Sequence, residues 1–242
     1  MKAILLSAGY GTRLYPLTKD KQKALLEVKG KKLLDMLVDS LEKIDAIDEI
    51  VLVTNDKFYQ NFIDWATKRK KKIPITVLND FTTSNENRLG AIGDLKYALD
   101  TLKIDDEIFV GGTDMYFTFE MKDFYDYYKA KNADVVMGEI IDDKDVLRRK
   151  GVATLDKNEK IIECEEKPKE PKGNFAVAPF YIYKRESTKE IDKYLAEGNS
   201  KDAPGSYPAW LCKHKDVYAM TYKGDCIDIG TIDDYNYLNG LK

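Results

Sequence analysis

Residue types that carry the commonest forms of nucleophilic catalysis are scarce in this chain of 242 residues. It contains one histidine, His214, which Lys213 and Lys215 flank in a polar stretch. A nucleophilic Ser or Cys needs a partner base of this kind nearby. We therefore expect no Ser–His or Cys–His system, and we interpret His214 as a structural or solvated residue.

Cysteines, long apolar runs and excess positive charge are also lacking. The three cysteines are odd in number, scattered and without C-x-x-C spacing, which favours reduced thiols over a zinc site or a disulfide framework. The longest apolar runs are strand-sized, so we expect no membrane partner. A net charge of −3 argues against nucleic-acid binding. A predicted strand directly follows Met1-Lys2 without an apolar leader, which favours a cytoplasmic location.

Internal repeats, low-complexity tracts and Pro/Gly/Ser linkers are absent as well. With 43% hydrophobic residues the chain can bury one good core, and we expect a single domain over residues 1–242. Nothing in these features decides between a monomer and a homo-oligomer.

Strand-like apolar runs alternate with helical spacing through the first half of the chain. This β-α-β-α order predicts an α/β fold with a mostly parallel central sheet and helices on both faces. The predicted strands are residues 3–6, 50–53, 75–78, 107–110 and 134–140, and apolar stripes at helical spacing lie within 33–44, 58–66, 92–102 and 124–128.

The second half has a different pattern. Two apolar runs flank Asp156-Lys157-Asn158-Glu159 and predict a hairpin. We interpret residues 141–242 as a smaller mixed-sheet lobe with a C-terminal helix, which caps a nucleotide-binding core of residues 1–140. The other strands expected there are residues 175–183, 217–222 and 226–229, and the helical pieces are 189–195, 206–213 and a helix from Ile232.

The stretch from Ala3 to Val28 is the most informative of the chain. Its first strand breaks into Ser7-Ala8-Gly9-Tyr10-Gly11-Thr12-Arg13. Two glycines permit a tight turn and a close approach of the backbone to a ligand, and small residues leave amide groups free for phosphate oxygens. Arg13 and Lys23 add two cations suited to a nucleoside triphosphate. Because cations in a ligand cleft are not core residues, we expect both to contribute little to folding.

The whole string G-x-G-T-R-L-x-P-L-T, followed by K-x-L-L-x-V, resembles the signature of the sugar-phosphate nucleotidyltransferases, or nucleotide-sugar pyrophosphorylases, including glucose-1-phosphate thymidylyltransferase-like proteins. It is neither a Walker loop, which needs G-K-S or G-K-T, nor a dinucleotide fingerprint, because Leu14 replaces the third glycine. The resemblance implies the Rossmann-like nucleotide-diphospho-sugar transferase fold. It also implies nucleotide binding by Ser7, Ala8, Gly9, Gly11, Thr12 and Arg13, with Arg13, Lys23 and Asp114 as catalytic residues.

Two aspartates resemble the metal ligands of this family. Asp114 follows a predicted buried strand in Gly111-Gly112-Thr113-Asp114, and Asp228 precedes Gly230-Thr231. The resemblance implies that Asp114 and Asp228 hold one Mg²⁺, an ion that proteins bind through one or two carboxylates plus substrate phosphates. The first segment departs from the usual G-D-N: Thr113 replaces the glycine and Met115 the asparagine. Taken alone, Asp114 could equally cap the following segment.

The acceptor side of the family pattern is matched less completely. Glu166-Lys167-Pro168 resembles the element in which the lysine holds the phosphate of a sugar 1-phosphate and the glutamate holds ring hydroxyls. The resemblance implies acceptor contacts by Gly151, Glu166, Lys167, Val177 and Tyr181. Pro179 replaces a glycine of the strand, and Lys201-Asp202-Ala203-Pro204-Gly205 replaces an acidic helical segment.

The loop that reads the nucleobase in this family corresponds to the polar stretch of residues 79–90. Asn79 and Asn85 can each offer a donor and an acceptor to a base edge, and the resemblance implies that Asn79, Asn85 and Gly90 bind the nucleotide. An Asn or Ser cap before the next helix explains the same residues equally well.

Taken together, the sequence predicts a Mg²⁺-dependent transfer of a nucleotidyl group from an NTP, a pyrimidine NTP being favoured, to a small phosphorylated acceptor. The expected acceptor is a sugar 1-phosphate. The alternatives are a cytidylyltransferase for a non-sugar phosphate such as phosphocholine, a glycosyltransferase, and a silent regulatory protein that binds sugar phosphates. A glycosyltransferase would carry a D-x-D motif, which Asp114-Met115-Tyr116 lacks.

Overall fold

Four parallel strands form the half of the molecule that carries the N-terminus. The computed structural model describes residues 1–70 and 72–241. Within it, β1 pairs with both β4 and β6, and β4 pairs with β5, all in parallel. Their carboxyl ends therefore meet at one edge of the sheet. The bounds are Lys2–Leu6 for β1, Glu49–Thr54 for β4, Ile75–Asn79 for β5 and Ile108–Gly112 for β6.

The long strand β11 (Phe175–Tyr183) joins this parallel half to the rest of the sheet. It runs antiparallel to β6, β8 and β9, so the mixed strands predicted for the second half extend the same sheet. Within the described residues the main sheet has nine strands. The remaining bounds are Asp134–Ile140 for β8, Gly151–Leu155 for β9, Ile161–Glu166 for β10 and Val217–Thr221 for β12.

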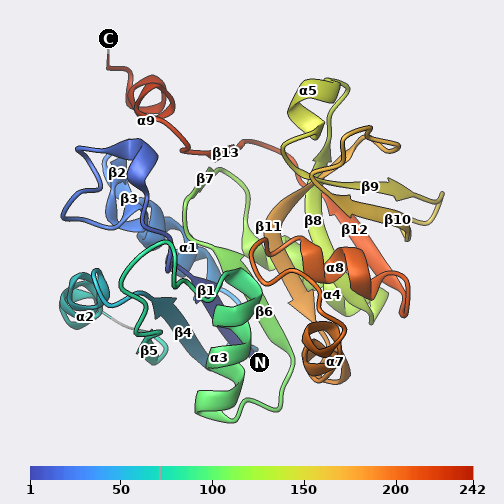
Figure 1. Ribbon diagram of the computed structural model, residues 1–242, viewed down its shortest axis with the longest axis horizontal. Coiled ribbons are helices and arrows are strands. Elements are labelled where there is room, and N and C mark those ends of the chain that lie inside the picture. The colour runs from blue at the N-terminus through green and yellow to red at the C-terminus, as the bar shows by residue number, and fades with distance from the viewer. Residues whose placement is uncertain (71, 242) are drawn as a thin grey trace.

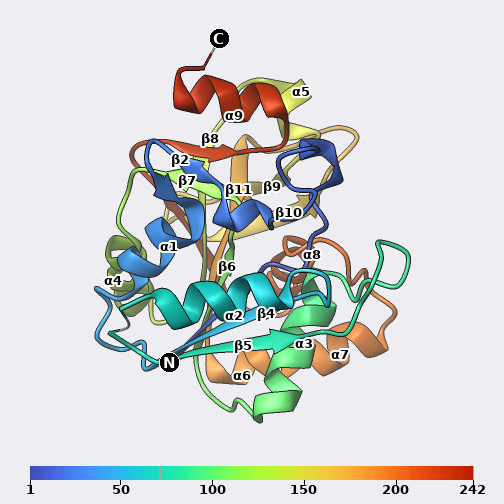
Figure 2. The same cartoon turned by 90° about the vertical axis from the view of Figure 1, so that its left-hand side faces the viewer.

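Helices cover both faces of the sheet, as predicted (Figures 1 and 2). Successive residues of β1 point to opposite faces: Ala3 and Leu5 pack in one apolar cluster and Ile4 in the other. Both faces of this strand are buried, which explains its unbroken apolar run. The helices of the Ala3 face are α1 (Leu33–Leu41), α2 (Tyr59–Lys68) and α4 (Met121–Lys131), and those of the Ile4 face are α3 (Ala91–Leu102), α7 (Glu190–Ala196) and α8 (Ser206–Leu211).

Several short elements are not apparent from the sequence pattern. The most consequential is β7 (Met115–Phe117), which pairs antiparallel with β13 (Cys226–Asp228). In this register Asp228 lies opposite Met115, next to Asp114. The others are η1 (Thr12–Leu14), η2 (Lys23–Leu25), β2 (Glu27–Val28), β3 (Lys31–Lys32), α5 (Lys144–Leu147) and α6 (Arg185–Thr188).

The C-terminal helix α9 (Ile232–Asn239) returns to the N-terminal half and lies beside β2 (Figures 1 and 2). Thr231 and Asp234 form a capping box at its start. At its other end, Asn239 accepts a hydrogen bond from the Lys29 backbone amide at 2.9 Å. The chain thereby brings its C-terminal segment over the loop that follows β1. None of the described helices is long and apolar enough to cross a bilayer.

Candidate active site

Side chains of other segments bind the carbonyl groups of the loop after β1 and leave its Gly9 and Gly11 amides free. The Gln22 amide donates to the Ser7 and Gly9 carbonyls at 3.3 and 3.5 Å, and Asn55 donates to the Ala8 carbonyl at 2.8 Å. Among the described residues, no partner accepts a hydrogen bond from the Gly9 or Gly11 amide. These amides are therefore available to a phosphate group. Nothing in the sequence marks the buried Gln22 as a support of this loop except its position directly before Lys23.

The two glycines of this loop serve different purposes. Gly11 adopts a left-handed conformation with φ of 61°, and Thr18 lies against it, its hydroxyl 2.7 Å from the Gly11 carbonyl. A side chain at Gly11 would be strained there. Gly9, in contrast, would meet nothing within 4 Å if it carried a Cβ. The space beside Gly9 belongs to a cavity, so a ligand can approach the backbone there.

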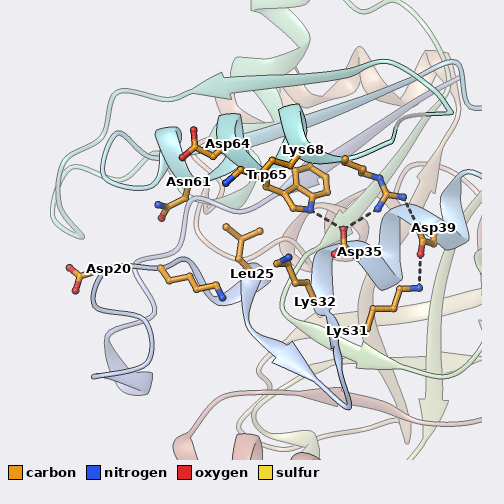
Figure 3. Close-up of a pocket in the computed structure, with 12 residues that line it drawn as sticks. Asp20, Leu25, Lys31, Lys32, Asp35, Asp39, Asn61, Asp64, Trp65 and Lys68 are labelled. Atoms are coloured by element: carbon orange, nitrogen blue, oxygen red, sulfur yellow. Dashed lines mark hydrogen bonds and ion pairs between the residues drawn. The ribbon is translucent and has the colours of Figure 1, made fainter.

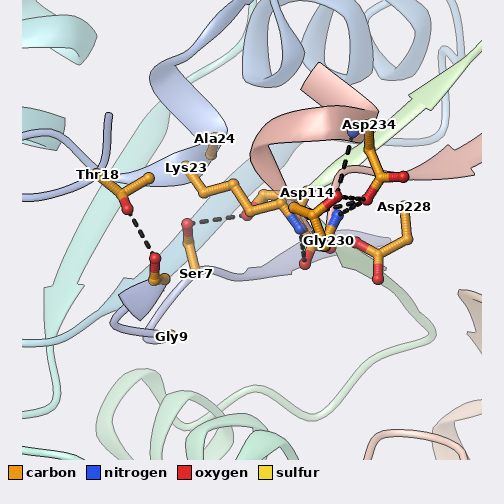
Figure 4. A network of polar contacts seen from close by, with 12 residues as sticks. Ser7, Gly9, Thr18, Lys23, Ala24, Asp114, Asp228, Gly230 and Asp234 are labelled. Carbon is orange, nitrogen blue, oxygen red and sulfur yellow. Dashed lines mark hydrogen bonds and ion pairs between the residues drawn. The ribbon is translucent and has the colours of Figure 1, made fainter. Parts of the chain in front are cut away.

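Lys23 joins the two ends of the chain. It lies at the start of the one-turn element η2, and its ammonium donates hydrogen bonds to the carboxylates of Asp114 and Asp228, at 3.0 and 2.7 Å (Figure 4). Its side chain is only 10% exposed. Burial by itself lowers the pKa of Lys23, but the attraction of the two carboxylates outweighs burial, and the pKa lies above its ordinary value. Lys23 is therefore a buried cation between two acids, and not the open-cleft cation on which the expectation of a small contribution to folding is based.

The two aspartates fit a divalent cation in one respect that the structure shows directly. Both carboxylates converge on a single positive group, the Lys23 ammonium. No group of three or more His, Cys, Asp or Glu side chains among the described residues could enclose a metal ion. Two carboxylates completed by phosphate oxygens and water match the usual Mg²⁺ arrangement at nucleotide sites.

A cavity of about 530 Å³ lies in front of the loop after β1. Most of the predicted nucleotide-binding residues line it, as do Lys23, Asp114 and Arg88. Thr113, which the sequence does not single out, also lines it and contacts the Ser7 hydroxyl at 2.9 Å. The predicted residues in its wall are Ser7, Gly9, Gly11, Thr12, Arg13 and Asn85.

Three predicted nucleotide-binding residues do not line this cavity. The Ala8 carbonyl faces Asn55, and the Asn79 side chain is engaged by Asp56 and the Phe81 amide. Gly90 has φ of 81° and packs against residues 201–202. Close packing of the chain on itself thus accounts for the glycine at position 90 in this structure.

Two buried acids lie next to each other, Asp80 in the polar stretch of residues 79–90 and Asp94 on the helix that follows it. Asp80 follows β5, and its carboxylate accepts from the Thr82 amide and hydroxyl, both at 2.7 Å. Asp94 on α3 faces it and has no other partner among the described residues. Burial, and then the neighbouring charge of Asp80, raise the pKa of Asp94 to about 8.

A second cavity of about 740 Å³ lies between the β9–β10 hairpin, β11 and β13. All five predicted acceptor residues line it: Gly151, Glu166, Lys167, Val177 and Tyr181. Among the described residues no group forms an ion pair with the Glu166 carboxylate. Burial raises the pKa of Glu166, and the charge of Lys167 offsets only part of this effect, so the pKa lies above its usual range. The structure adds three consecutive cations that sequence reasoning passed over, Arg148, Arg149 and Lys150.

Pro179 also lines the second cavity, and the fold explains how the strand tolerates it. The pairing of β11 with β8 shifts register between Val177 and Tyr181, so Pro179 lies in an irregular stretch of that ladder. A proline, which has no amide donor, is accommodated at such a position.

The two cavities meet at three shared residues, Arg13, Asp114 and Gly230. Arg13 is exposed and forms no ion pair with any residue in the described ranges. One cavity therefore presents loop amides and cations, and the other presents Lys167 and Glu166. Arg13, Lys23 and the two carboxylates that Lys23 contacts lie where the two cavities meet.

A third cavity of about 670 Å³ lies between η2, α1 and α2 (Figure 3). None of the predicted site residues lines it. Its charged groups largely satisfy one another: Asp35 accepts from the Trp65 indole at 2.9 Å and from Arg69 at 3.0 Å. His214 lies outside all of these cavities and packs on Trp210 with the two rings tilted by 45° and 4.3 Å between their centroids, as expected for a structural residue.

Comparisons with known proteins agree with this arrangement. The family model described as nucleotidyl transferase matches residues 2–240. A protein of Sulfolobus acidocaldarius, provisionally named a mannose-1-phosphate guanyltransferase, is 32% identical over 99% of this chain and 62% of its own length. The UTP–glucose-1-phosphate uridylyltransferase of Haloferax volcanii is 31% identical over 76% of this chain and 72% of its own length. The chain thus spans only about three fifths of the first relative.

Solved structures share the whole fold. A crystal structure from Bacillus anthracis, provisionally named a glucose-1-phosphate thymidylyltransferase, superposes with a TM-score of 0.82 and 26% identity. The match covers 99% of this chain and 94% of that one. The α/β fold with its mostly parallel core, predicted from the sequence, is therefore confirmed.

Proposed function

Because the chain belongs to the nucleotidyl transferase family, we propose that it joins an NTP to a sugar 1-phosphate, releasing pyrophosphate and forming a nucleotide sugar. The observation that carries the proposal is the position of Lys23, Asp114 and Asp228 where two substrate-sized cavities meet. A reaction between two phosphorylated substrates needs its positive charges at such a junction.

The nucleophile of this reaction needs no base from the protein. A phosphate monoester has a second pKa near 6 and is largely a dianion at neutral pH. Its oxygen attacks the α-phosphorus of the NTP, and the bond from that phosphorus to the bridging oxygen of pyrophosphate breaks. The lack of a histidine at the site is consistent with this chemistry. Catalysis then depends on alignment of the substrates and neutralisation of their charge.

The residues of the two cavities divide this work. The amides of the loop after β1 and the Arg13 guanidinium would hold the β- and γ-phosphates and the departing pyrophosphate. Lys23 would turn from the two carboxylates to the α-phosphate and the incoming phosphate. Mg²⁺ held by Asp114 and Asp228 would supply Lewis-acid stabilisation of the phosphate charge. Lys167 would bind the acceptor phosphate, and the unpaired Glu166 would accept from sugar hydroxyls.

We further propose a pyrimidine NTP on the basis of the Ser7-Ala8-Gly9 opening and the short loop that carries Asn85, whose amide can pair with a donor and an acceptor of a base edge. Named relatives use different bases, among them guanylyl and uridylyl groups.

A matrix of substrates tests the proposal. Pyrophosphate release is measured with UTP, CTP, dTTP, GTP and ATP against glucose 1-phosphate, mannose 1-phosphate and phosphocholine, with MgCl₂. We expect release that requires both a nucleotide and a sugar 1-phosphate. Release only with phosphocholine would identify the non-sugar cytidylyltransferase instead. Hydrolysis to free phosphate without an acceptor would overturn the proposed reaction.

A further inference from the structure

The segment from Lys201 to Gly205 connects the two substrate cavities. Its first residues pack on the start of α3: the Lys201 carbonyl accepts from the Ile92 amide at 2.9 Å, and the Asp202 carbonyl accepts from the Ala91 amide at 3.1 Å. These bonds satisfy helix amides that would otherwise lack a partner. The segment is therefore attached to the helix that follows the nucleobase loop.

Gly90 shows how close this attachment is. A Cβ built at Gly90 would lie 2.5 Å from the Lys201 carbonyl oxygen and 2.9 Å from the Asp202 Cα. Contacts this short involve backbone atoms, which cannot turn aside as a flexible side chain can. The backbone at Gly90 therefore packs directly on the backbone of Lys201 and Asp202.

A side-chain pair strengthens the link. The Arg88 guanidinium donates two hydrogen bonds to the Asp202 carboxylate, both at 3.0 Å. Arg88 lines the nucleotide cavity, so a bound NTP would lie against a residue that Asp202 orients. The two side chains are 47% and 61% exposed, and exposed pairs of this kind contribute little to stability. The pair is therefore better explained by the positioning of Arg88 than by a contribution to the stability of the fold.

The other end of the segment forms a wall of the acceptor cavity. Pro204 and Gly205 line it, and a Cβ built at Gly205 would lie 2.2 Å from a Glu166 carboxylate oxygen. The Glu166 carboxylate therefore lies directly against the Gly205 backbone, in space that a side chain at residue 205 would fill. Only Ala203 and Pro204 separate Gly205 from Asp202 of the Arg88–Asp202 pair.

We propose that Asp202 is a positioning residue that makes binding of the acceptor depend on the bound nucleotide, acting through the Lys201–Gly205 segment on Glu166. The inference rests on the proposed function, since it assigns the two cavities to the nucleotide and the acceptor. The reason is mechanical: a nucleotide that orders residues 85–90 also orders Gly205, and so reduces the conformational freedom that the acceptor must otherwise remove on binding.

Hydrogen–deuterium exchange of the full chain tests the link without turnover. Exchange is followed in peptides covering residues 80–90 and 203–211, with and without each of MgUTP, MgCTP, MgdTTP, MgGTP and MgATP. In the wild type we expect the nucleotide that slows exchange in 80–90 to slow it in 203–211 as well. In Asp202→Asn we expect protection of 80–90 to remain and protection of 203–211 to be lost. Gly90→Ala should lose it too.

The chain offers a matched control. Arg185 and Asp105 form a similar two-bonded pair, 57% and 48% exposed, away from both cavities. Asp105→Asn should behave as the wild type. Steady-state kinetics with the active substrate pair should give an acceptor KM at least about fivefold higher in Asp202→Asn at saturating NTP, with kcat changed less than about twofold.

The outcomes distinguish a failure of the proposed link from a failure of the proposed function. Protection of 80–90 without protection of 203–211 in the wild type, or protection of both in Asp202→Asn, would overturn the link and leave the proposed function standing. No protection of 80–90 by any nucleotide would overturn both. An acceptor KM unchanged in Asp202→Asn would also count against the link.

Discussion

The Lys23 ammonium lies 2.7 Å from a carboxylate oxygen of Asp228, although 205 positions separate the two residues in the chain. The contact exists because β13 pairs with β7 and places Asp228 opposite Met115. It ties η2 of the N-terminal half to the C-terminal segment of the chain.

Lys23→Ala should lower turnover by on the order of 10²-fold or more, as expected on removal of a charge that stabilises the transition state. Unlike the sequence alone, the structure predicts a loss of stability as well, because Asp114 and Asp228 would face each other without their shared cation. Arg13→Ala should lower turnover similarly with an unchanged melting temperature, since Arg13 is exposed. Kinetics and thermal unfolding of both variants check this, with the exposed Lys19→Ala as a control. Equal melting temperatures for the Lys23 variant and the wild type would contradict it.

Asp114→Asn and Asp228→Asn should each remove most of the metal-dependent rate and raise the Mg²⁺ concentration needed for half-maximal activity, because one carboxylate ligand is lost. If both hold the same ion, the double variant should be scarcely slower than the poorer single variant. Mg²⁺ titration of the four proteins measures this. Losses that add in log rate, with an unshifted Mg²⁺ midpoint, would mean that the aspartates act separately.

Lys167→Ala should raise the acceptor KM and leave nucleotide binding unchanged, because Lys167 lines only the acceptor cavity. Lys169→Ala is the matched control, since Lys169 is exposed and lines neither cavity. Two-substrate kinetics together with nucleotide titration distinguish the variants. An equal effect of the two substitutions would remove Lys167 from the site.

Asp94→Asn should make the protein more stable at pH 8 but not at pH 4. Burial and Asp80 raise the pKa of Asp94 to about 8 in the native state, whereas the pKa of this group in the unfolded chain is about 4. Between these values the native state binds more protons than the unfolded state, so the free energy of unfolding falls as pH rises. Asparagine cannot ionise and avoids this loss. Urea unfolding at pH 4, 6 and 8 measures it, with Asp100→Asn as an exposed control on α3; a variant no more stable than the wild type at pH 8 would refute the prediction.

Much of the fold follows from local sequence. Strands and helices of the parallel core appear at the predicted places because their apolar periodicity directly reflects burial on one face or two. The loop after β1 could be recognised because its glycines and small residues are close together in the chain. The same locality explains why the β9–β10 hairpin, which ends at Glu166, could be predicted.

Other features depend on contacts between distant segments, which local patterns do not encode. The pairing of β7 with β13 rests on two three-residue strands, too short to show a period. Gly90 resembles a nucleotide-binding residue in sequence, yet the backbone of residues 201–202 accounts for its conformation. The two ion pairs of Lys23 likewise join residues that only the fold brings together.

The fate of labelled phosphorus tests the proposed reaction most directly. The active NTP is supplied with label at the α-phosphorus in one reaction and at the γ-phosphorus in another, together with the sugar 1-phosphate and Mg²⁺. We predict that the α label appears in a nucleotide sugar and the γ label in pyrophosphate, in equal amounts and only when the acceptor is present. The α label in free nucleoside monophosphate or diphosphate, or the γ label in inorganic phosphate, would contradict nucleotidyl transfer.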